Sequence, residues 1–206
     1  MMAVRQRVPN EERSGRTRAK VIEATIDLLH RVGYESTSMQ RIIQQAGISR
    51  GALLHQFPTK VDLMIAVAEQ LVSDDLRHYE EVLHGLTSWE RQLELLVDAA
   101  WEAFRRPDHQ AFLEIWMATR GDDALREQFG PFVAQGDIRT DEGLRRLLAD
   151  SGAGPDMVAA VAQMLVGSLR GFAIENLLRD RSSRLDAAVD ALKRATILQL
   201  RDAGAR

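Results

Sequence analysis

The chain has 206 residues, a formal net charge of −3 and 45% hydrophobic residues. This length accommodates one large or two small domains, and the hydrophobic content is sufficient for a buried core. The absence of cysteine excludes disulfides and thiolate metal sites. We find no apolar run of the length that a signal or membrane-spanning segment requires, so we expect a soluble cytoplasmic protein with no membrane contact.

Charge is unevenly distributed along the chain. Residues 1–66 hold ten Lys and Arg against six Asp and Glu, whereas residues 67–206 hold seventeen against twenty-four. A basic N-terminal part on an acidic body is the electrostatic pattern expected of a small nucleic-acid-binding domain.

Residues 1–16 contain Pro9 and Gly15 and show no hydrophobic periodicity. We interpret them as a flexible basic arm that could enter a minor groove or follow phosphates. A solvated tail without a DNA-binding role is an equally good interpretation. From Thr17 onward, apolar residues recur at helical spacing and predict a first helix that Gly33 ends.

The segment from Ser36 to Leu63 has the pattern of two short helices joined by a tight turn. Thr37 followed by Gln40 has the spacing of a capping box at the start of the first helix. Gly47 supplies a left-handed residue that ends this helix, and Ser49 can cap the next. One apolar face of the first helix is formed by Met39, Ile42, Ile43 and Ala46. The pattern predicts a helix-turn-helix motif.

The second helix of this motif has the chemistry of a base-reading helix. With Ser49 as its N-cap, its first turn holds the residues that approach base edges in docked helix-turn-helix proteins. Arg50 could make a forked contact to guanine, Ala52 could touch a thymine methyl, and Gly51 would allow close backbone approach. Lys60 begins the following helix, where a cation opposes the macrodipole, so we expect it to reach outward to a phosphate. The alternative interpretation of this segment is a plain helical hairpin without a DNA-binding role.

Three stretches of the N-terminal part occur together: Gly33-Tyr34, Thr37-Ser38 and residues 46–63, AGISRGALLHQFPTKVDL. In residue type and spacing they resemble the DNA-binding domain of TetR-family transcriptional regulators. The resemblance covers roughly residues 17–66. It implies a regulator that binds DNA through this domain and dimerises through its last two helices, with a C-terminal domain that varies widely across the family.

The resemblance also implies roles for single residues. Thr37 or Ser38, positions 54 and 56, and Lys60 would contact the DNA backbone. The family usually has Tyr at position 54 and His or Tyr at position 56, and this chain has Leu54 and Gln56. Leu54 cannot donate to a phosphate, whereas Gln56 still can. The residues implied nearest the bases are Arg50, Ala52 and His55. The full expected DNA-binding set is Thr37, Ser38, Ser49, Arg50, Gly51, Ala52, Leu54, His55, Gln56 and Lys60.

The rest of the chain shows helical periodicity throughout. An apolar stripe from Leu63 to Leu86 predicts one long helix that leaves the DNA-binding part, and Ser88 and Pro107 mark the starts of the next two. Gly130-Pro131 and Gly136 are expected to break the segment that follows. We therefore predict an all-α fold. Its parts are a flexible basic arm (1–16), an N-terminal three-helix helix-turn-helix domain (17–66) and a C-terminal helical ligand-binding and dimerisation domain (67–206).

The last third predicts two long helices, one from about Asp156 to Arg179 and one centred on Leu185–Leu192. Small residues such as Gly167 and Gly171 would let a partner helix approach closely. Two such hairpins facing each other would form an isologous four-helix interface. Because a helix-turn-helix monomer reads few bases, we expect a homodimer on a palindromic operator in double-stranded DNA.

Aromatic residues outside the DNA-binding part are concentrated between residues 79 and 132. Such rings can line a small-molecule pocket, although at helical spacing they more commonly fill a core. The acidic, aromatic-rich body suggests an apolar or cationic effector. The candidate ligand-binding residues are Trp89, Trp101, Phe104, His109, Phe112, Trp116, Arg120, Phe132, Phe172 and Asn176, with Glu114 and Phe129 as further candidates.

Catalytic patterns are weak in this sequence. Glu81 and His84 have the Glu-x-x-His spacing of di-iron bundles, but no second copy occurs. No zinc-type histidine pair, nucleophile elbow, phosphate loop or dinucleotide fingerprint is found. We therefore predict no catalytic residue, metal or cofactor. The predicted function is a ligand-responsive, sequence-specific transcriptional repressor that a small molecule releases from its operator. The alternatives are a regulator controlled by a protein partner and an all-helical enzyme.

Overall fold

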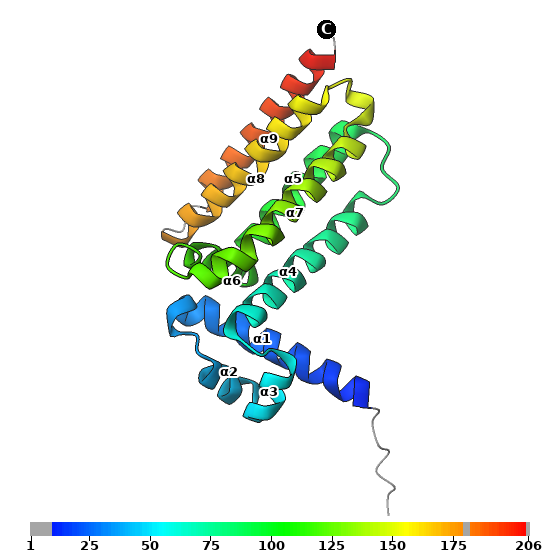
Figure 1. The fold of residues 1–206 in the computed structure, drawn as a ribbon. Coiled ribbons are helices and arrows are strands. Elements are labelled where there is room, and N and C mark those ends of the chain that lie inside the picture. The colour runs from blue at the N-terminus through cyan, green and yellow to red at the C-terminus, as the bar shows by residue number, and fades with distance from the viewer. Residues whose placement is uncertain (1–9, 179–181, 205–206) are drawn as a thin grey trace, which may run out of the picture. The chain divides into compact units, whose positions relative to one another are not determined.

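The computed structural model describes residues 10–178 and 182–204, which contain nine α-helices and no strand (Figure 1). A short 3-10 turn, Ala149–Ser151, precedes α8. The all-α fold class predicted from the sequence is confirmed. The helices are α1 (Asn10–Ser36), α2 (Met39–Ala46), α3 (Arg50–Gln56), α4 (Lys60–Leu83), α5 (Trp89–Arg105), α6 (Pro107–Ala118), α7 (Asp123–Leu147), α8 (Pro155–Leu178) and α9 (Ser182–Gly204).

The chain divides into two compact units. Unit 1 combines the N-terminal residues up to Leu71 with Gln110–Phe129, and unit 2 combines Val72–His109 with the chain from Gly130 onward. Helices α4, α6 and α7 each contribute residues to both units. The expected domain 17–66 therefore lies within a larger unit that also contains most of α6 and the start of α7.

Unit 1 is built on the apolar faces that the periodicity predicted. Helix α1 packs on α2 and α3, and each of these elements contributes side chains that are completely buried. Burial of apolar side chains is the main favourable term in holding such short helices together. The completely buried core residues include Val21, Leu29, Ile42, Leu53 and Leu63.

Helix α1 begins at Asn10, seven residues before the predicted start. Residues 10–16, which were expected in the flexible arm, are helical here, and residues 1–9 of that arm lie outside the described residues. Two contacts explain the longer helix. Arg16 pairs with Glu12 one turn earlier, and the Ser14 hydroxyl accepts a hydrogen bond from α3 (2.6 Å).

Helix α7 is continuous where the sequence predicted interruptions. The expected breaks at Gly130-Pro131 and at Gly136 do not occur. Proline removes one intrahelical hydrogen bond, but its fixed φ is compatible with a helix. Buried Leu125 and Phe129 before the proline and buried Leu144 after it anchor the same helix. Side-chain burial on both sides therefore outweighs the local preference for a break.

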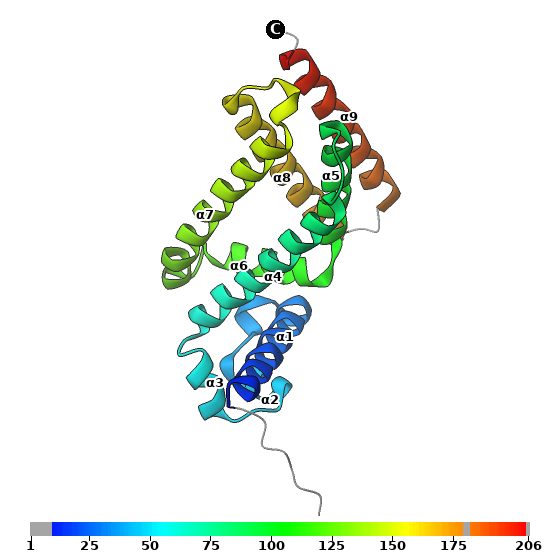
Figure 2. The same cartoon turned by 90° about the vertical axis from the view of Figure 1, so that its right-hand side faces the viewer.

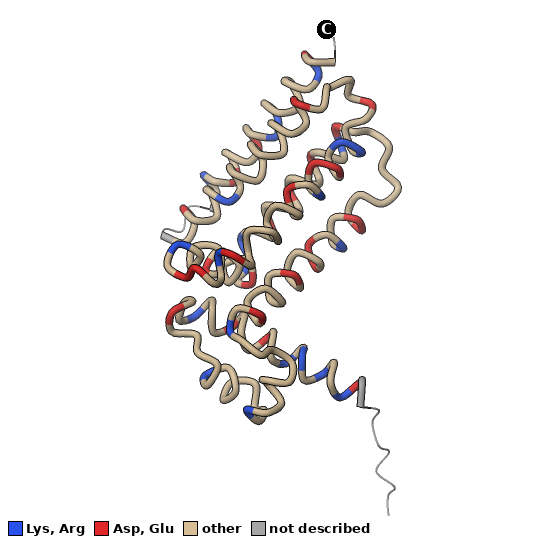
Figure 3. Tube along the Cα trace, viewed as in Figure 1, with Lys and Arg blue, Asp and Glu red and all other residues tan. Residues whose placement is uncertain are grey.

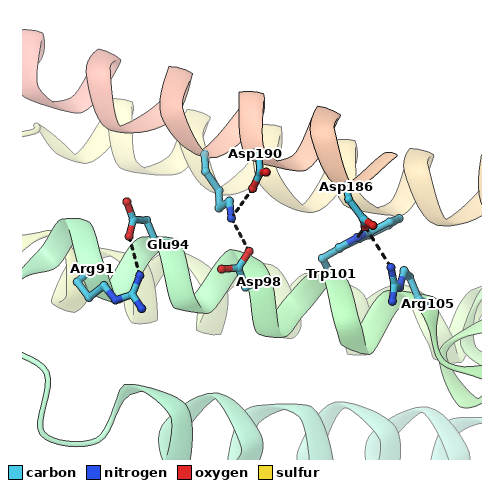
Figure 4. A network of polar contacts seen from close by, with 8 residues as sticks. Arg91, Glu94, Asp98, Trp101, Arg105, Asp186 and Asp190 are labelled. Atoms are coloured by element: carbon cyan, nitrogen blue, oxygen red, sulfur yellow. Dashed lines mark hydrogen bonds and ion pairs between the residues drawn. The ribbon is translucent and has the colours of Figure 1, made fainter. Parts of the chain in front are cut away.

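In unit 2, α5, α8 and α9 pack against one another, and α8 and α9 run side by side in both views (Figures 1 and 2). Polar contacts link α5 to α9 along their length (Figure 4). The Lys193 ammonium bonds Asp98 of α5 (2.5 Å) and Asp190 of its own helix (2.8 Å). These contacts hold the last helix on the body.

Helix α8 contradicts the expectation that no apolar run is long enough to span a membrane. Its residues Pro155–Leu177 are long and apolar enough to cross one by length and composition, so that expectation was wrong. Core helices of soluble proteins pass the same test, but only 33% of the most apolar stretch of α8 is buried inside the chain. Among the large apolar side chains of α8, Ile174 and Leu177 are exposed.

Candidate nucleic-acid interface

The predicted turn between α2 and α3 is present. Gly47 adopts the left-handed conformation (φ 64, ψ 41) and ends α2. Ser49 caps α3 by accepting a hydrogen bond from the Ala52 N–H (3.2 Å). Ile42 of α2 and Leu53 of α3 are completely buried. The helix-turn-helix geometry therefore follows from one glycine, one serine cap and two apolar anchors.

The cap of α2 lies one residue later than predicted. Ser38 is the N-cap and accepts a hydrogen bond from the Arg41 N–H (3.3 Å). Thr37 is completely buried and donates its hydroxyl to the Gly33 carbonyl (2.7 Å). The predicted capping box of Thr37 with Gln40 is therefore wrong, because the Thr37 side chain finds a buried acceptor. Of the two expected backbone contacts, Ser38 lies at the surface and Thr37 in the core.

Helix α3 presents one side to the core and the other to solvent. Leu53 and the capping residue Phe57 are buried. Ala52 and Gln56 are half-buried. Figure 3 shows Lys and Arg along the first part of α1 and on the short helices that follow it. The exposed residues of α3 and its cap are Ser49, Arg50, Gly51, Leu54 and His55.

Gln56 contacts α1 in this structure. Its side-chain amide donates to the Ser14 hydroxyl (2.6 Å). The Arg18 guanidinium lies 4.7 Å from the centre of the Phe57 ring. These contacts fasten the end of α3 to the start of α1, and sequence reasoning did not predict them. Leu54, 40% exposed, presents an apolar side chain where the family resemblance implied a phosphate donor.

Lys60 lies at the start of α4 and points into unit 1. Its ammonium donates to the Tyr34 carbonyl (2.8 Å) and lies 3.7 Å from the centre of the Tyr34 ring. Burial lowers the pKa of Lys60, and the negative charges of Glu35 and Asp122 oppose that shift. The outward orientation expected for this side chain is not the one observed.

Tyr34 makes two further contacts that the sequence analysis missed. Its N–H donates to the Glu114 carboxylate (3.1 Å), and its hydroxyl donates to Asp122 (2.7 Å). Gly33 has φ +73, and a Cβ there would lie 3.0 Å from the Glu114 carboxylate. The glycine thus permits the close approach. Glu114, a candidate ligand anchor, is engaged in this contact, which no local signal could have revealed across 80 residues.

The candidate ligand-binding residues of unit 1 form one aromatic cluster. The Phe112 ring lies 6.1 Å from Trp116 and 5.8 Å from Phe129, and Trp116 and Phe129 meet edge to face at 5.8 Å. Phe112 and Phe129 are buried, Trp116 is half-buried, and Arg120 is exposed. Ring pairs at these separations are stabilising.

The candidates of unit 2 form two ring pairs. The Trp101 ring lies edge to face with Phe172 at 6.3 Å, and its N–H donates to Asp186 of α9 (2.7 Å; Figure 4). Trp101 therefore already uses its polar edge to join α5 to α9. The Phe104 ring lies 3.9 Å from that of His109. The remaining candidates, Trp89, Phe132 and Asn176, are half-buried.

His109 is buried beside positive charge. Burial, followed by the charge of Arg170 on α8, lowers its pKa to about 4. The imidazole is therefore neutral at pH 7. Among the described residues, no group of three or more His, Asp or Glu side chains is placed to hold a metal ion.

Together, the capped helix pair, the left-handed glycine and the exposed side of α3 define a helix-turn-helix DNA-binding protein. Residues 21–67 match the family model described as bacterial regulatory proteins, tetR family. This segment is therefore a DNA-binding domain of the TetR family of transcriptional regulators.

Relatives and solved structures agree with this assignment. The chain is similar to the HTH-type transcriptional regulator CymR of Pseudomonas putida, with 27% identity over 175 residues that cover 85% of this chain and 86% of that protein. The fold is similar to that of a TetR-family regulator from Streptomyces coelicolor (TM-score 0.70, 20% identity, 92% and 97% of the two chains). It is also similar to a Saccharomonospora viridis regulator in complex with choline (TM-score 0.66, 16% identity, 88% and 94%).

Proposed function

We propose that this protein is a cytoplasmic, ligand-responsive repressor that reads a palindromic operator through α3. The exposed first turn of α3 carries this proposal. It presents Arg50 and Gly51 to solvent, while the opposite side of the helix is fixed by completely buried Leu53. A forked guanidinium on a rigid helix can bond guanine in a major groove. His55, exposed one turn later, extends the same surface.

The rest of the proposed DNA contact surrounds this turn. Ser38 and Ser49 sit at the exposed starts of α2 and α3, where the backbone N–H groups of a helix attract phosphate. Gly51 and half-buried Ala52 allow close approach of the helix to the bases. We assign Gln56 to holding α1 and leave Thr37 to the core, so neither is proposed as a direct phosphate contact.

Selection of bound fragments from bacterial genomic DNA tests the proposal. The recovered sites are sequenced, and binding is repeated at two salt concentrations. A shared palindrome supports a dimeric sequence reader. Salt-sensitive binding without any shared sequence would mean that unit 1 binds DNA only through non-specific electrostatic attraction, and it would contradict the proposal.

We further propose that α8 and α9 form the homodimer interface. Ile174 and Leu177 of α8 are 43% and 51% exposed, and Leu198 of α9 is 61% exposed. Exposed Gly167 and Gly171 continue the α8 stripe at helical spacing and would let a second copy approach closely. Exposed apolar side chains together with small residues on one helix pair are typical of a protein interface. Sedimentation equilibrium measures the dimer directly, and a monomer at micromolar concentration would contradict it.

For the effector, we propose a small apolar or cationic molecule that contacts the aromatic residues of the body. The Trp116 ring is half-buried, and aromatic faces attract both apolar groups and cations. The choline bound to the Saccharomonospora viridis regulator is a cation of this class. A thermal-shift screen of aromatic acids, aromatic amines and quaternary amines tests the class. A preference for the acids would overturn it.

A further inference from the structure

Tyr34 lies where α1 turns toward α2, and two carboxylates from a distant part of the chain hold it there. Its hydroxyl donates to Asp122 in the turn before α7 (2.7 Å), and its N–H donates to Glu114 of α6 (3.1 Å). All three residues belong to unit 1, although 88 and 80 positions separate the partners. The turn into α2 is therefore attached to a segment that the sequence analysis assigned to the ligand-binding domain.

The bond between Tyr34 and Asp122 joins a buried hydroxyl to an ionised carboxylate. Asp122 also accepts a hydrogen bond from the Leu125 N–H (2.9 Å), which caps the first turn of α7. This bond, followed by that from the Tyr34 hydroxyl, lowers the pKa of Asp122. Tyr34 is only 5% exposed, and burial raises the pKa of its hydroxyl, which keeps its proton. Hydrogen bonds to an ionised acceptor are roughly twice as strong as neutral ones.

The turn that follows is short and closed by its own hydrogen bonds. Gly33 interrupts α1 (φ 73, ψ 174), and an interrupted helix leaves N–H groups without intrahelical acceptors. Glu114 accepts the one of Tyr34. The Thr37 N–H donates to the Tyr34 carbonyl (3.1 Å), and the Thr37 hydroxyl donates to the Gly33 carbonyl (2.7 Å). Ser38, the N-cap of α2, follows directly. The position of Tyr34 therefore sets where α2 begins.

We propose that Asp122 is a positioning residue of the DNA-binding unit, which holds Tyr34 in place and thereby fixes the start of α2. Helix α2 packs on α3, so a displaced start of α2 changes the surface that the two helices present together. The consequence for operator binding rests on the proposed DNA-binding function. The consequence for α2 in the free protein does not.

The first test is amide hydrogen exchange of the DNA-free protein. Tyr34→Phe keeps the buried ring and removes only the hydroxyl. We expect exchange in α2 to become about 10-fold faster, while amides of α5 and α9 in unit 2 keep their wild-type rates, because only local opening becomes easier. Tyr79→Phe, the same substitution at a half-buried tyrosine of unit 2, is the matched control. Wild-type exchange of α2 in Tyr34→Phe, or an equal increase throughout the chain, would overturn the proposal.

The second test replaces the acceptor. Asparagine is as good an N-cap as aspartate, so Asp122→Asn removes the charge and keeps a cap for α7. We expect a smaller increase in α2 exchange than Tyr34→Phe gives, and no further increase in the double variant, because both substitutions act on one hydrogen bond. Asp123→Asn, at a side chain that is 86% exposed, is the control and should exchange as wild type. Additive effects of the two substitutions would overturn the proposal.

The third test uses the selected operator DNA. We expect Tyr34→Phe to weaken binding by about 3-fold to 10-fold. The slope of log affinity against log salt should stay at its wild-type value, because no cation is removed. Tyr79→Phe should bind as wild type does. Wild-type operator affinity in Tyr34→Phe would overturn the claim that this turn positions α2 for DNA. If no operator is found, the proposed function fails, while the two exchange experiments still decide the role of Asp122.

Discussion

Helices α3 and α8 both leave much of their surface in solvent, but the surfaces differ in chemistry. Helix α3 exposes Arg50, Gly51 and His55 above a buried leucine. Helix α8 exposes Ile174 and Leu177 together with glycines. Charged and small groups on a rigid helix suit the edges of bases, whereas an apolar stripe suits a second apolar surface. The comparison shows that the chemistry of the exposed atoms, rather than the extent of exposure, indicates which kind of partner a helix binds.

The largest expected effect comes from placing a charge on the α8 surface. Ile174→Glu would bury an unpaired carboxylate in the proposed interface, so we expect the dimer dissociation constant to rise by more than about 100-fold. Operator affinity should fall with it. Sedimentation equilibrium measures the first effect. Ile138→Glu is the control, since Ile138 of α7 is 59% exposed and lies outside α8 and α9. If the two variants had similar dimer dissociation constants, α8 would not be the dimer interface.

His109, which lies beside the positive charge of Arg170 on α8, predicts that the stability of the protein depends on pH. The pKa of His109 is lowered to about 4 by burial, by Arg170 and by Arg106, with Asp108 opposing. The unfolded chain, with a His pKa of about 6.5, binds the proton more readily than the folded chain. The contribution of His109 to stability is therefore fully present above pH 6.5 and is lost as the pH falls toward 4. The loss is at most about 3 kcal/mol.

Urea unfolding between pH 4 and 7 measures this loss. His109→Phe should flatten the profile over that range, because it removes the titrating group but keeps a ring beside Phe104. His78→Gln, at an exposed histidine, serves as the control and should retain the wild-type slope. An unchanged slope in His109→Phe would assign the pH dependence to other groups.

Arg50→Ala sharpens the assignment of α3. Loss of a forked contact to guanine costs about 1–3 kcal/mol, so we expect operator affinity to fall by about 5-fold to 150-fold and base preference to relax at one position of each half-site. Binding to unrelated DNA should change far less. Competition assays with single-base operator variants measure both. Unchanged affinity and base preference would show that α3 is not the reading helix.

The smallest expected effect is a gain in operator affinity. Leu54→Tyr adds a hydroxyl donor to an exposed position of α3, where the family resemblance implies a phosphate contact. One added hydrogen bond contributes about 0.5–1.5 kcal/mol, so affinity should rise by about 2-fold to 10-fold. Leu54→Phe adds the ring without the hydroxyl and is the control. Equal affinities for the two variants would show that position 54 does not reach the DNA backbone.

The two units also differ in how far the sequence predicted them. In α2 and α3, the left-handed Gly47, the Ser49 cap and the apolar face that contains buried Ile42 were all predicted, because each depends on residues within one or two helical turns. The start of α1 and the continuity of α7 were predicted wrongly. Both depend on tertiary contacts, such as the bond from Gln56 to Ser14, that outweigh local propensity.

The aromatic candidates show the same limit in the body. Composition identified the rings, but it could not show that Trp101 donates to Asp186 or that Phe112, Trp116 and Phe129 form one cluster. Spacing along a helix indicates which side of it is apolar. It does not indicate which ring another helix will meet.

The sequence by itself determined the fold class, the helix-turn-helix motif and the residues on the exposed side of α3, because periodicity, caps and turn glycines act over a few residues. Only the tertiary structure decided that Thr37 is buried, that Lys60 points toward Tyr34, and that Glu114 and Asp122 belong with the DNA-binding unit. These contacts join residues up to 88 positions apart. Their partners are selected by packing and by the need to satisfy partly buried polar groups, which no local pattern records.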